Sequence, residues 1–121
     1  NNTSLVSQSP FVSLLEVNGQ KIMCLNGGPQ FTPNPTISFY MVCETQAELT
    51  KTWKGLMKDG SVFMPLDQYE WSEQYGWLSD RYGVSWQITL GKISEVGQKI
   101  SPSLLFTGTQ LGKAQTAIQF Y

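Results

Sequence analysis

The stretch from Tyr75 to Leu90 limits what this chain can fold into. In its second half, residues 84–90, large apolar side chains alternate strictly with polar ones, which is the period of a half-buried β-strand. Residues 75–79 are typical of a shorter strand, and the intervening DRYG contains the Asp and Gly that a tight reversal favours. The stretch therefore predicts a β-hairpin with one apolar face and one polar face.

The polar face of this hairpin presents a hydroxyl, an amide and a hydroxyl in a row, at Ser85, Gln87 and Thr89. Turned inward, these groups would form the hydrogen-bonding floor of a pocket, because small-molecule sites are mostly apolar with a few placed polar groups. The alternative is an ordinary solvent-facing surface, since antiparallel sheets commonly expose one face to water. The candidate walls of the pocket are Tyr40, Trp71 and Trp77.

The charge of the chain excludes two classes of partner. Its net charge is near −1 and no cluster of Lys and Arg occurs, so it lacks the basic footprint that nucleic acid or an anionic membrane requires.

No apolar run approaches the length of a transmembrane helix. Charged residues make up only 14% of the chain, below the quarter usual in soluble domains, which favours a subunit that buries surface in an oligomer.

The cysteines and the N-terminal residues favour a cytoplasmic protein. Cys24 and Cys43 each lie in an apolar, strand-like run, where reduced structural cysteines usually occur. Only their even number supports a disulfide. Residues 1–10 lack the basic start and apolar core of a signal peptide, and their polar, turn-prone composition predicts a loose terminus unless another segment holds it.

A first hairpin and a central strand precede the stretch at 75–90. Phe11 to Val17 and Gln20 to Leu25 flank Asn18-Gly19, a pair suited to a type I′ turn because both central residues have positive φ. Thr36 to Cys43 is apolar on both faces and rich in β-branched and aromatic residues. It therefore predicts a strand covered on both sides.

A helix is predicted next. Thr45 and Glu48 fit a capping box at its start, and Asp59-Gly60 suits its left-handed end. Trp53 lies in its apolar stripe and is interpreted as a core residue.

A short strand at 61–64 and a loop at 65–73 are expected to follow. Acidic and aromatic residues on this loop favour either a substrate lid or a solvated loop with locally packed aromatics. The loop carboxylates can also serve as acid, base or metal ligands, and because the chain has no His, a metal site there would suit Mg²⁺ or Ca²⁺. These carboxylates are Asp67, Glu70 and Glu73.

The C-terminal part predicts a polar connection at 91–99, a strand at 100–107 and a helix from Lys113 onward. The apolar residues of this helix follow helical spacing, yet the pattern stops at Tyr121 without a cap. The pattern predicts either that the polypeptide continues or that this segment docks elsewhere.

Three segments of the sequence resemble a known family. They are LNGGP at 25–29, TISFYMVCETQAEL at 36–49 and YGWLSDRYGVSWQI at 75–88. In this order they resemble the PhnB-like branch of the vicinal oxygen chelate superfamily, the glyoxalase, bleomycin-resistance and dioxygenase group, often labelled 3-demethylubiquinone 3-methyltransferase. The resemblance implies an α+β fold of paired βαβββ modules, which form curved mixed sheets around a cleft, with helices on the convex side.

The resemblance also implies a domain organisation. Residues 1–90 would be the end of one glyoxalase-like domain, with a complete βαβββ module at 36–90, followed by a linker at 91–99. Residues 100–121 are similar to the opening strand and helix of such a domain, either truncated or exchanged with a partner. Each large apolar side chain left exposed there would cost roughly 1.5 to 3 kcal/mol, so we expect a homodimer.

The resemblance implies the cleft but not a metal. Metal-dependent members place His at the start of each module's first strand and Glu in the last strand. The first-strand positions here fall at or near Thr36 and Pro102, and the last-strand position is Gln87. None of these is a good transition-metal ligand. The sequence also has no Gly-rich strand-to-helix turn for a nucleotide-like cofactor. We therefore expect a cofactor-free and metal-free cleft that binds a small, partly apolar molecule.

Two alternatives stay open at this point. The first is a metal-dependent vicinal oxygen chelate enzyme, a lyase, a dioxygenase or a resistance-type protein, that uses the carboxylates of the loop at 65–73. The second is a non-catalytic dimeric structural protein whose cleft has lost its ligand.

Overall fold

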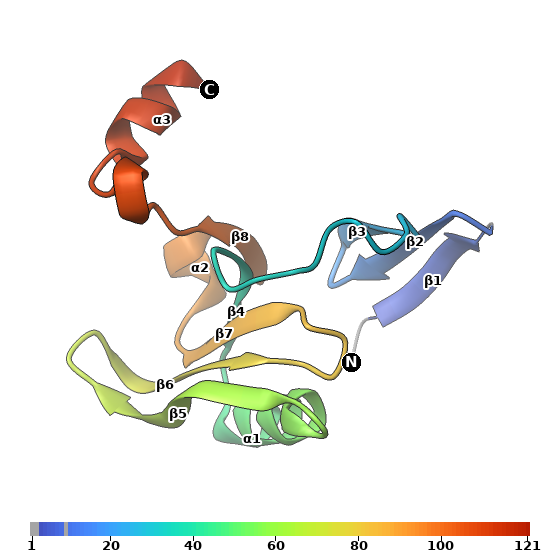
Figure 1. Ribbon diagram of the computed structural model, residues 1–121. Coiled ribbons are helices and arrows are strands. Elements are labelled where there is room, and N and C mark those ends of the chain that lie inside the picture. Colours follow the sequence, from blue (N-terminus) through green and yellow to red (C-terminus); the bar gives the residue numbers. More distant parts are fainter. Residues whose placement is uncertain (1–2, 9) are drawn as a thin grey trace. The chain divides into compact units, whose positions relative to one another are not determined.

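The computed structural model describes residues 3–8 and 10–121, which form two compact units divided between Thr32 and Pro33. Figure 1 colours both units along the chain. Both contain β-sheets, and within the described residues helices occur in the second unit. The predicted α+β class is therefore confirmed.

The first unit is an antiparallel sheet of β1 (Thr3–Gln8), β2 (Val12–Val17) and β3 (Gln20–Leu25), in that order. The predicted turn is confirmed, because Asn18 and Gly19 have φ of 52° and 82°. Residues 3–8 are not loose, because β2 holds them: they pair with that strand and so satisfy their backbone groups. Of the other residues of this terminus, Pro10 lies in a bend, and residues 1, 2 and 9 lie outside the described residues.

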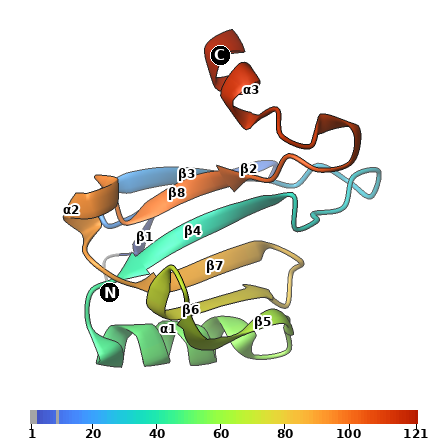
Figure 2. The ribbon, with the colours of Figure 1, turned by 90° about the vertical axis from the view of Figure 1, so that its left-hand side faces the viewer.

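The second unit contains a five-stranded mixed sheet in the order β5-β6-β7-β4-β8. β4 and β7 are parallel, and the other neighbours are antiparallel. The strands are β4 (Ile37–Cys43), β5 (Ser61–Tyr69), β6 (Ser72–Ser79), β7 (Ser85–Leu90) and β8 (Ile100–Leu104). α1 (Gln46–Met57) joins β4 to β5 and lies along one face of the sheet (Figure 2). The predicted βαβββ module is thus complete from β4 to β7.

The ends of α1 follow the predicted signals with one difference. The Thr45 side chain accepts a hydrogen bond from the Glu48 amide at 3.2 Å, as a cap does, and the Glu48 carboxylate forms an ion pair with Lys99. At the other end Asp59, not Gly60, takes the left-handed conformation, with φ of 60°. Gly60 is required for a different reason, since a Cβ there would lie 2.3 Å from the Ser79 carbonyl oxygen.

The predicted hairpin at 75–90 is confirmed as β6 and β7. Asp80 holds its turn: Oδ1 accepts from the amides of Tyr82 and Val84, and Oδ2 accepts from Trp86 Nε1 at 2.9 Å. The apolar face of the hairpin meets α1, and Leu78 and Ile88 on that face are fully buried. Trp53 of α1 is also buried, as predicted.

The predicted loop at 65–73 is mostly strand, so this prediction was wrong. β5 continues to Tyr69 and β6 begins at Ser72, leaving Glu70 and Trp71 as the turn. β5 is the edge strand of the sheet and its register shifts several times, which lets it accommodate Pro65. The connection at 91–99 likewise contains a short helix, α2 (Ile93–Val96).

The C-terminal strand ends at Leu104, and a 3₁₀ turn, η1 (Gly108–Gln110), leads into α3 (Ala114–Phe120). Ile118, Phe120 and Tyr121 are 70%, 86% and 77% exposed. The homodimer that would cover them, and the domain limits at 90 and 99, stay predictions. In the described part of the chain no helix is long and apolar enough to cross a membrane.

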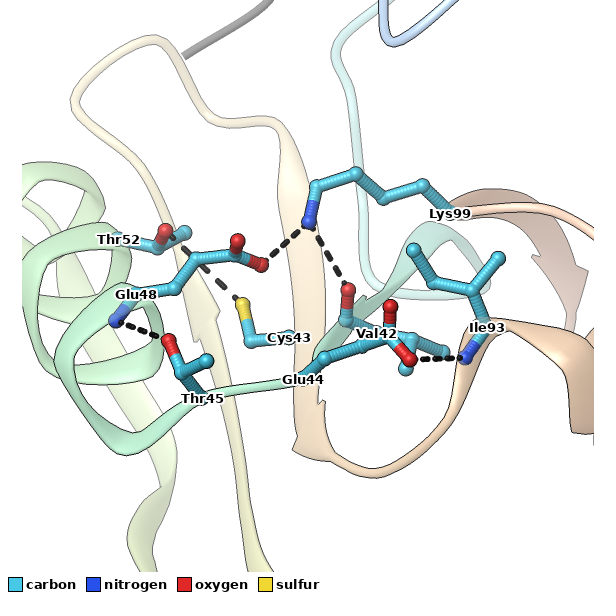
Figure 3. Close-up of polar contacts among 8 residues, drawn as sticks. All are labelled: Val42, Cys43, Glu44, Thr45, Glu48, Thr52, Ile93 and Lys99. Carbon is cyan, nitrogen blue, oxygen red and sulfur yellow. Dashed lines mark hydrogen bonds and ion pairs between the residues drawn. The ribbon is translucent and has the colours of Figure 1, made fainter.

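Lys99 joins the start of β8 to α1 and β4 (Figure 3). Its Nζ donates to Glu48 Oε1 at 2.5 Å and to the Val42 carbonyl oxygen at 3.1 Å, and its side chain is 15% exposed. Cys43 lies beside this contact, and burial raises the pKa of its thiol to about 11. The thiol is therefore protonated at neutral pH, as expected for a structural cysteine, and both Cys24 and Cys43 are free.

The Lys99 contact makes stability depend on pH. Burial alone would raise the pKa of Glu48, but the hydrogen bond and charge of Lys99 outweigh it and lower that pKa. The ionised carboxylate therefore stabilises the folded protein above the unfolded-state pKa, and this contribution is lost as pH falls through the folded-state pKa. We expect Glu48→Gln to cost about 1 kcal/mol or less at neutral pH, because the carboxylate is partly exposed.

Urea unfolding from neutral to acidic pH measures this effect. Glu48→Gln should make the loss of stability on acidification shallower than in the natural sequence. Equal steepness in the natural sequence and in Glu48→Gln would contradict the assignment.

Candidate functional site

The predicted floor residues Ser85, Gln87 and Thr89 lie on the face of the sheet opposite α1. The face toward α1 is fixed by two contacts: Cys43 Sγ meets Thr52 Oγ1 at 4.0 Å, and Gly76 lies against the Trp53 ring. Ile88 pairs with Gly76, so the alternate residues of β7 point the other way. Tyr40 and Trp77 share this second face, because each pairs with Gln87 across a strand boundary.

Gln87 is the centre of a hydrogen-bond network that joins four strands. Its Oε1 accepts from Tyr75 Oη at 2.6 Å, and its Nε2 donates to Ser38 Oγ at 2.7 Å and to Ser103 Oγ at 3.3 Å. Burial, with smaller effects from two neighbouring tyrosines, raises the pKa of Tyr75 to about 12. The Tyr75 hydroxyl therefore stays protonated and acts as the donor, which fixes the orientation of the Gln87 amide.

The two floor hydroxyls are also bonded within the protein. Ser85 Oγ accepts from Trp77 Nε1 at 2.7 Å. Thr89 Oγ1 lies 2.7 Å from Ser72 Oγ and 3.2 Å from the Gln74 carbonyl oxygen, to which it donates. Because these polar groups already have partners, the floor is rigid, and a ligand need not satisfy them.

A depression of about 460 Å³ opens where the parallel strands β4 and β7 end. Of the six predicted site residues, Tyr40, Trp71 and Thr89 line it, whereas Ser85, Gln87 and Trp77 do not. The other lining residues are Val42, Glu44, Ser72, Glu73, Leu90, Gly91, Lys92, Glu95 and Val96.

Trp71 forms one wall of this depression and is held in place by two tyrosines. Its ring stacks on Tyr69 with centroids 5.2 Å apart and an angle of 18°, and it meets Tyr75 edge-on at 5.4 Å. Tyr69 Oη donates to the Pro65 carbonyl oxygen at 2.8 Å. Although 61% of Trp71 is exposed, these contacts fix its position at the turn.

Sequence reasoning missed several residues of this region. Tyr75, Ser38 and Ser103 complete the Gln87 network. Ser38 lies two residues before Tyr40, and Tyr75 two residues before Trp77, so alternation along each strand places both on the same face as a predicted site residue. Glu44, Lys92 and Glu95 follow the ends of β4 and β7, but no local pattern shows that these two strands are neighbours. Several lining residues without a predicted role therefore lie in the connections after parallel strands, whereas Val42, Ser72 and Leu90 lie within strands.

The residues present do not fit a metal ion. Gln87 Oε1 is already bonded to Tyr75, and Pro102 has no side-chain donor atom. Across residues 3–8 and 10–121, no three side chains of His, Cys, Asp or Glu are grouped to hold a metal, so Asp67, Glu70 and Glu73 are not gathered into one three-ligand site. The β4–α1 junction, Glu44-Thr45, has no glycine either, so it does not fit a nucleotide-like methyl donor.

Comparisons with known proteins place the chain in a family. The model of the 3-demethylubiquinone-9 3-methyltransferase family matches residues 2–89. The structure of a PhnB protein from Bacillus cereus is 35% identical, with 75% of this chain and 81% of that chain covered and a TM-score of 0.72. The structure of protein PA1353 from Pseudomonas aeruginosa is 26% identical, with 65% of this chain and 61% of that chain covered and a TM-score of 0.57. Comparison with curated proteins gave no match. The chain therefore belongs to the 3-demethylubiquinone-9 3-methyltransferase family and is PhnB-like.

Proposed function

We propose that this protein binds a small organic molecule, without a metal, in the depression at the ends of β4 and β7. The observation that carries the proposal is an exposed but fixed Trp71 beside a depression of about 460 Å³. This volume falls within the range of roughly 300 to 1,000 Å³ usual for small-molecule sites. The proposal places the protein in the cytoplasm, a setting that suits its two free thiols.

Each kind of lining residue has a role in this proposal. The exposed part of Trp71 packs against a flat or apolar part of the ligand, and Val42, Leu90 and Val96 supply further apolar contact. The Tyr40 hydroxyl offers one polar contact to the ligand. The Gln87 network joins the neighbouring strands and holds them in register, so little ordering is required on binding.

Binding rather than methyl transfer is proposed, because the residues fit neither a metal nor a nucleotide-like methyl donor. The family's description therefore does not define the activity of this chain.

A screen of diverse soluble small molecules tests the proposal. Thermal unfolding and Trp fluorescence should identify compounds that stabilise the protein and quench its emission. Calorimetry should then show about tenfold or greater loss of affinity in Trp71→Ala. Tyr82→Ala, which removes an exposed aromatic residue from a different turn of the same unit, should have no effect. A screen without hits, or hits that bind Trp71→Ala as tightly as the natural sequence, would contradict the proposal.

A further inference from the structure

The depression is unevenly charged. Three carboxylates line it: Glu44 after β4, Glu73 in β6 and Glu95 in α2. Lys92 is the one basic residue of the described chain in that lining. A ligand in the depression therefore meets a negative potential, which attracts cations and repels anions.

These carboxylates are not neutralised by the protein. The ion pairs found in residues 3–8 and 10–121 join Arg81 to Asp59 and Lys99 to Glu48, so none of the three is paired with Lys or Arg. Glu44 Oε2 accepts one backbone hydrogen bond, from the Ile93 amide at 3.3 Å (Figure 3). Glu44 is thereby positioned at the start of α2.

The aromatic wall is an independent feature that favours the same kind of ligand. Trp71 is fixed by Tyr69 and Tyr75 and still exposes most of its surface. The face of an indole ring attracts an ammonium group more strongly than any other side-chain ring does. Tyr40 adds a second ring to the lining.

We infer that the ligand of this depression carries an ammonium group beside an apolar or aromatic part. The inference rests on the proposed function, because it assigns the chemical class of the ligand at the same site. A bare metal ion is a poorer candidate, since no three acidic side chains are grouped closely enough to coordinate one in the described chain. Carboxylates spread around an aromatic wall suit a bulkier organic cation.

Three probes that share one ring test the inference: benzyltrimethylammonium, neutral benzyl alcohol and anionic benzoate. Titration followed by Trp fluorescence and calorimetry should show the cation binding roughly tenfold more tightly than the alcohol. Benzoate should bind least. The affinity of the cation should fall as salt is added, because exposed charges are screened.

Matched variants locate the charge effect. The double change Glu73→Gln and Glu95→Gln should weaken the cation roughly threefold to tenfold and leave benzyl alcohol unchanged. Glu70→Gln, next to Trp71 but outside the lining, should leave all three affinities unchanged. An equal loss in Glu70→Gln, or a cation affinity that does not respond to the double change, would overturn the inference.

The same titrations separate failure of the inference from failure of the proposed function. If benzoate or benzyl alcohol binds as tightly as the cation, and Trp71→Ala abolishes that binding, the charge inference fails and the small-molecule site stands. If no probe binds at millimolar concentration but the diverse screen gives hits, the charge inference again fails alone. If neither gives binding, both fail.

Discussion

Gly76→Ala is expected to destabilise the folded protein by roughly 2 to 3 kcal/mol, as overpacking of a core does. A Cβ on Gly76 would lie 2.4 Å from Cζ3 and 2.7 Å from Cη2 of Trp53, and 3.2 Å from Leu66 Cα. Trp53 is only 8% exposed, so its ring cannot swing into solvent. The contact between β6 and α1 therefore depends on a residue without a side chain at position 76.

Urea unfolding measures the cost of Gly76→Ala, and two variants make it specific. Gly91→Ala is the matched control, because its Cβ would meet its nearest neighbour, Val42 Cγ1, at an ordinary 3.8 Å. In a Trp53→Leu background the ring atoms are gone, so Gly76→Ala should cost much less there. The same cost in both backgrounds would show that the ring is not the obstacle.

Gln87→Leu is expected to cost roughly 3 kcal/mol, because it removes the partner of several buried polar groups at once. The Tyr75 hydroxyl loses its acceptor and Ser38 loses its donor, and these residues are 4% and 3% exposed. A leucine of similar size replaces the packing but none of the hydrogen bonds. The loss should therefore appear mainly as lower stability of the sheet.

The control for Gln87→Leu is Gln98→Leu, which removes an exposed Gln–Ser hydrogen bond of 3.3 Å and should cost little. Tyr75→Phe should be less costly in the Gln87→Leu background than in the natural sequence, since its hydroxyl has by then lost its acceptor. Urea unfolding of the four proteins measures this coupling. Strictly additive costs would mean that Tyr75 and Gln87 do not act together.

Local chemistry made much of the fold predictable. Asn18-Gly19 is a turn because of its positive φ values, Thr45 caps α1, and strict alternation places Gln87 and Ile88 on opposite faces of β7. Each of these signals acts between neighbours in the sequence. They were sufficient for the hairpins, the helix and the βαβββ module.

The errors occurred where distant pairing overrides local composition. Polar residues in β1 and Pro65 in β5 argue against strands, yet both segments pair along a sheet edge. The depression was only partly predictable for the same reason. Thr89 comes from the alternation within β7, whereas Glu44 and Glu95 join the site because β4 and β7 are parallel neighbours.

The most direct test of the central claim is to map a hit from the small-molecule screen by amide and indole NMR shifts. The binding site described here predicts the largest changes at the Trp71 indole and at the amides of Thr89, Gly91 and Lys92, with saturation at one affinity. Changes centred on β1 to β3, or on the sheet face that meets α1, would contradict the assignment of the depression as the ligand site.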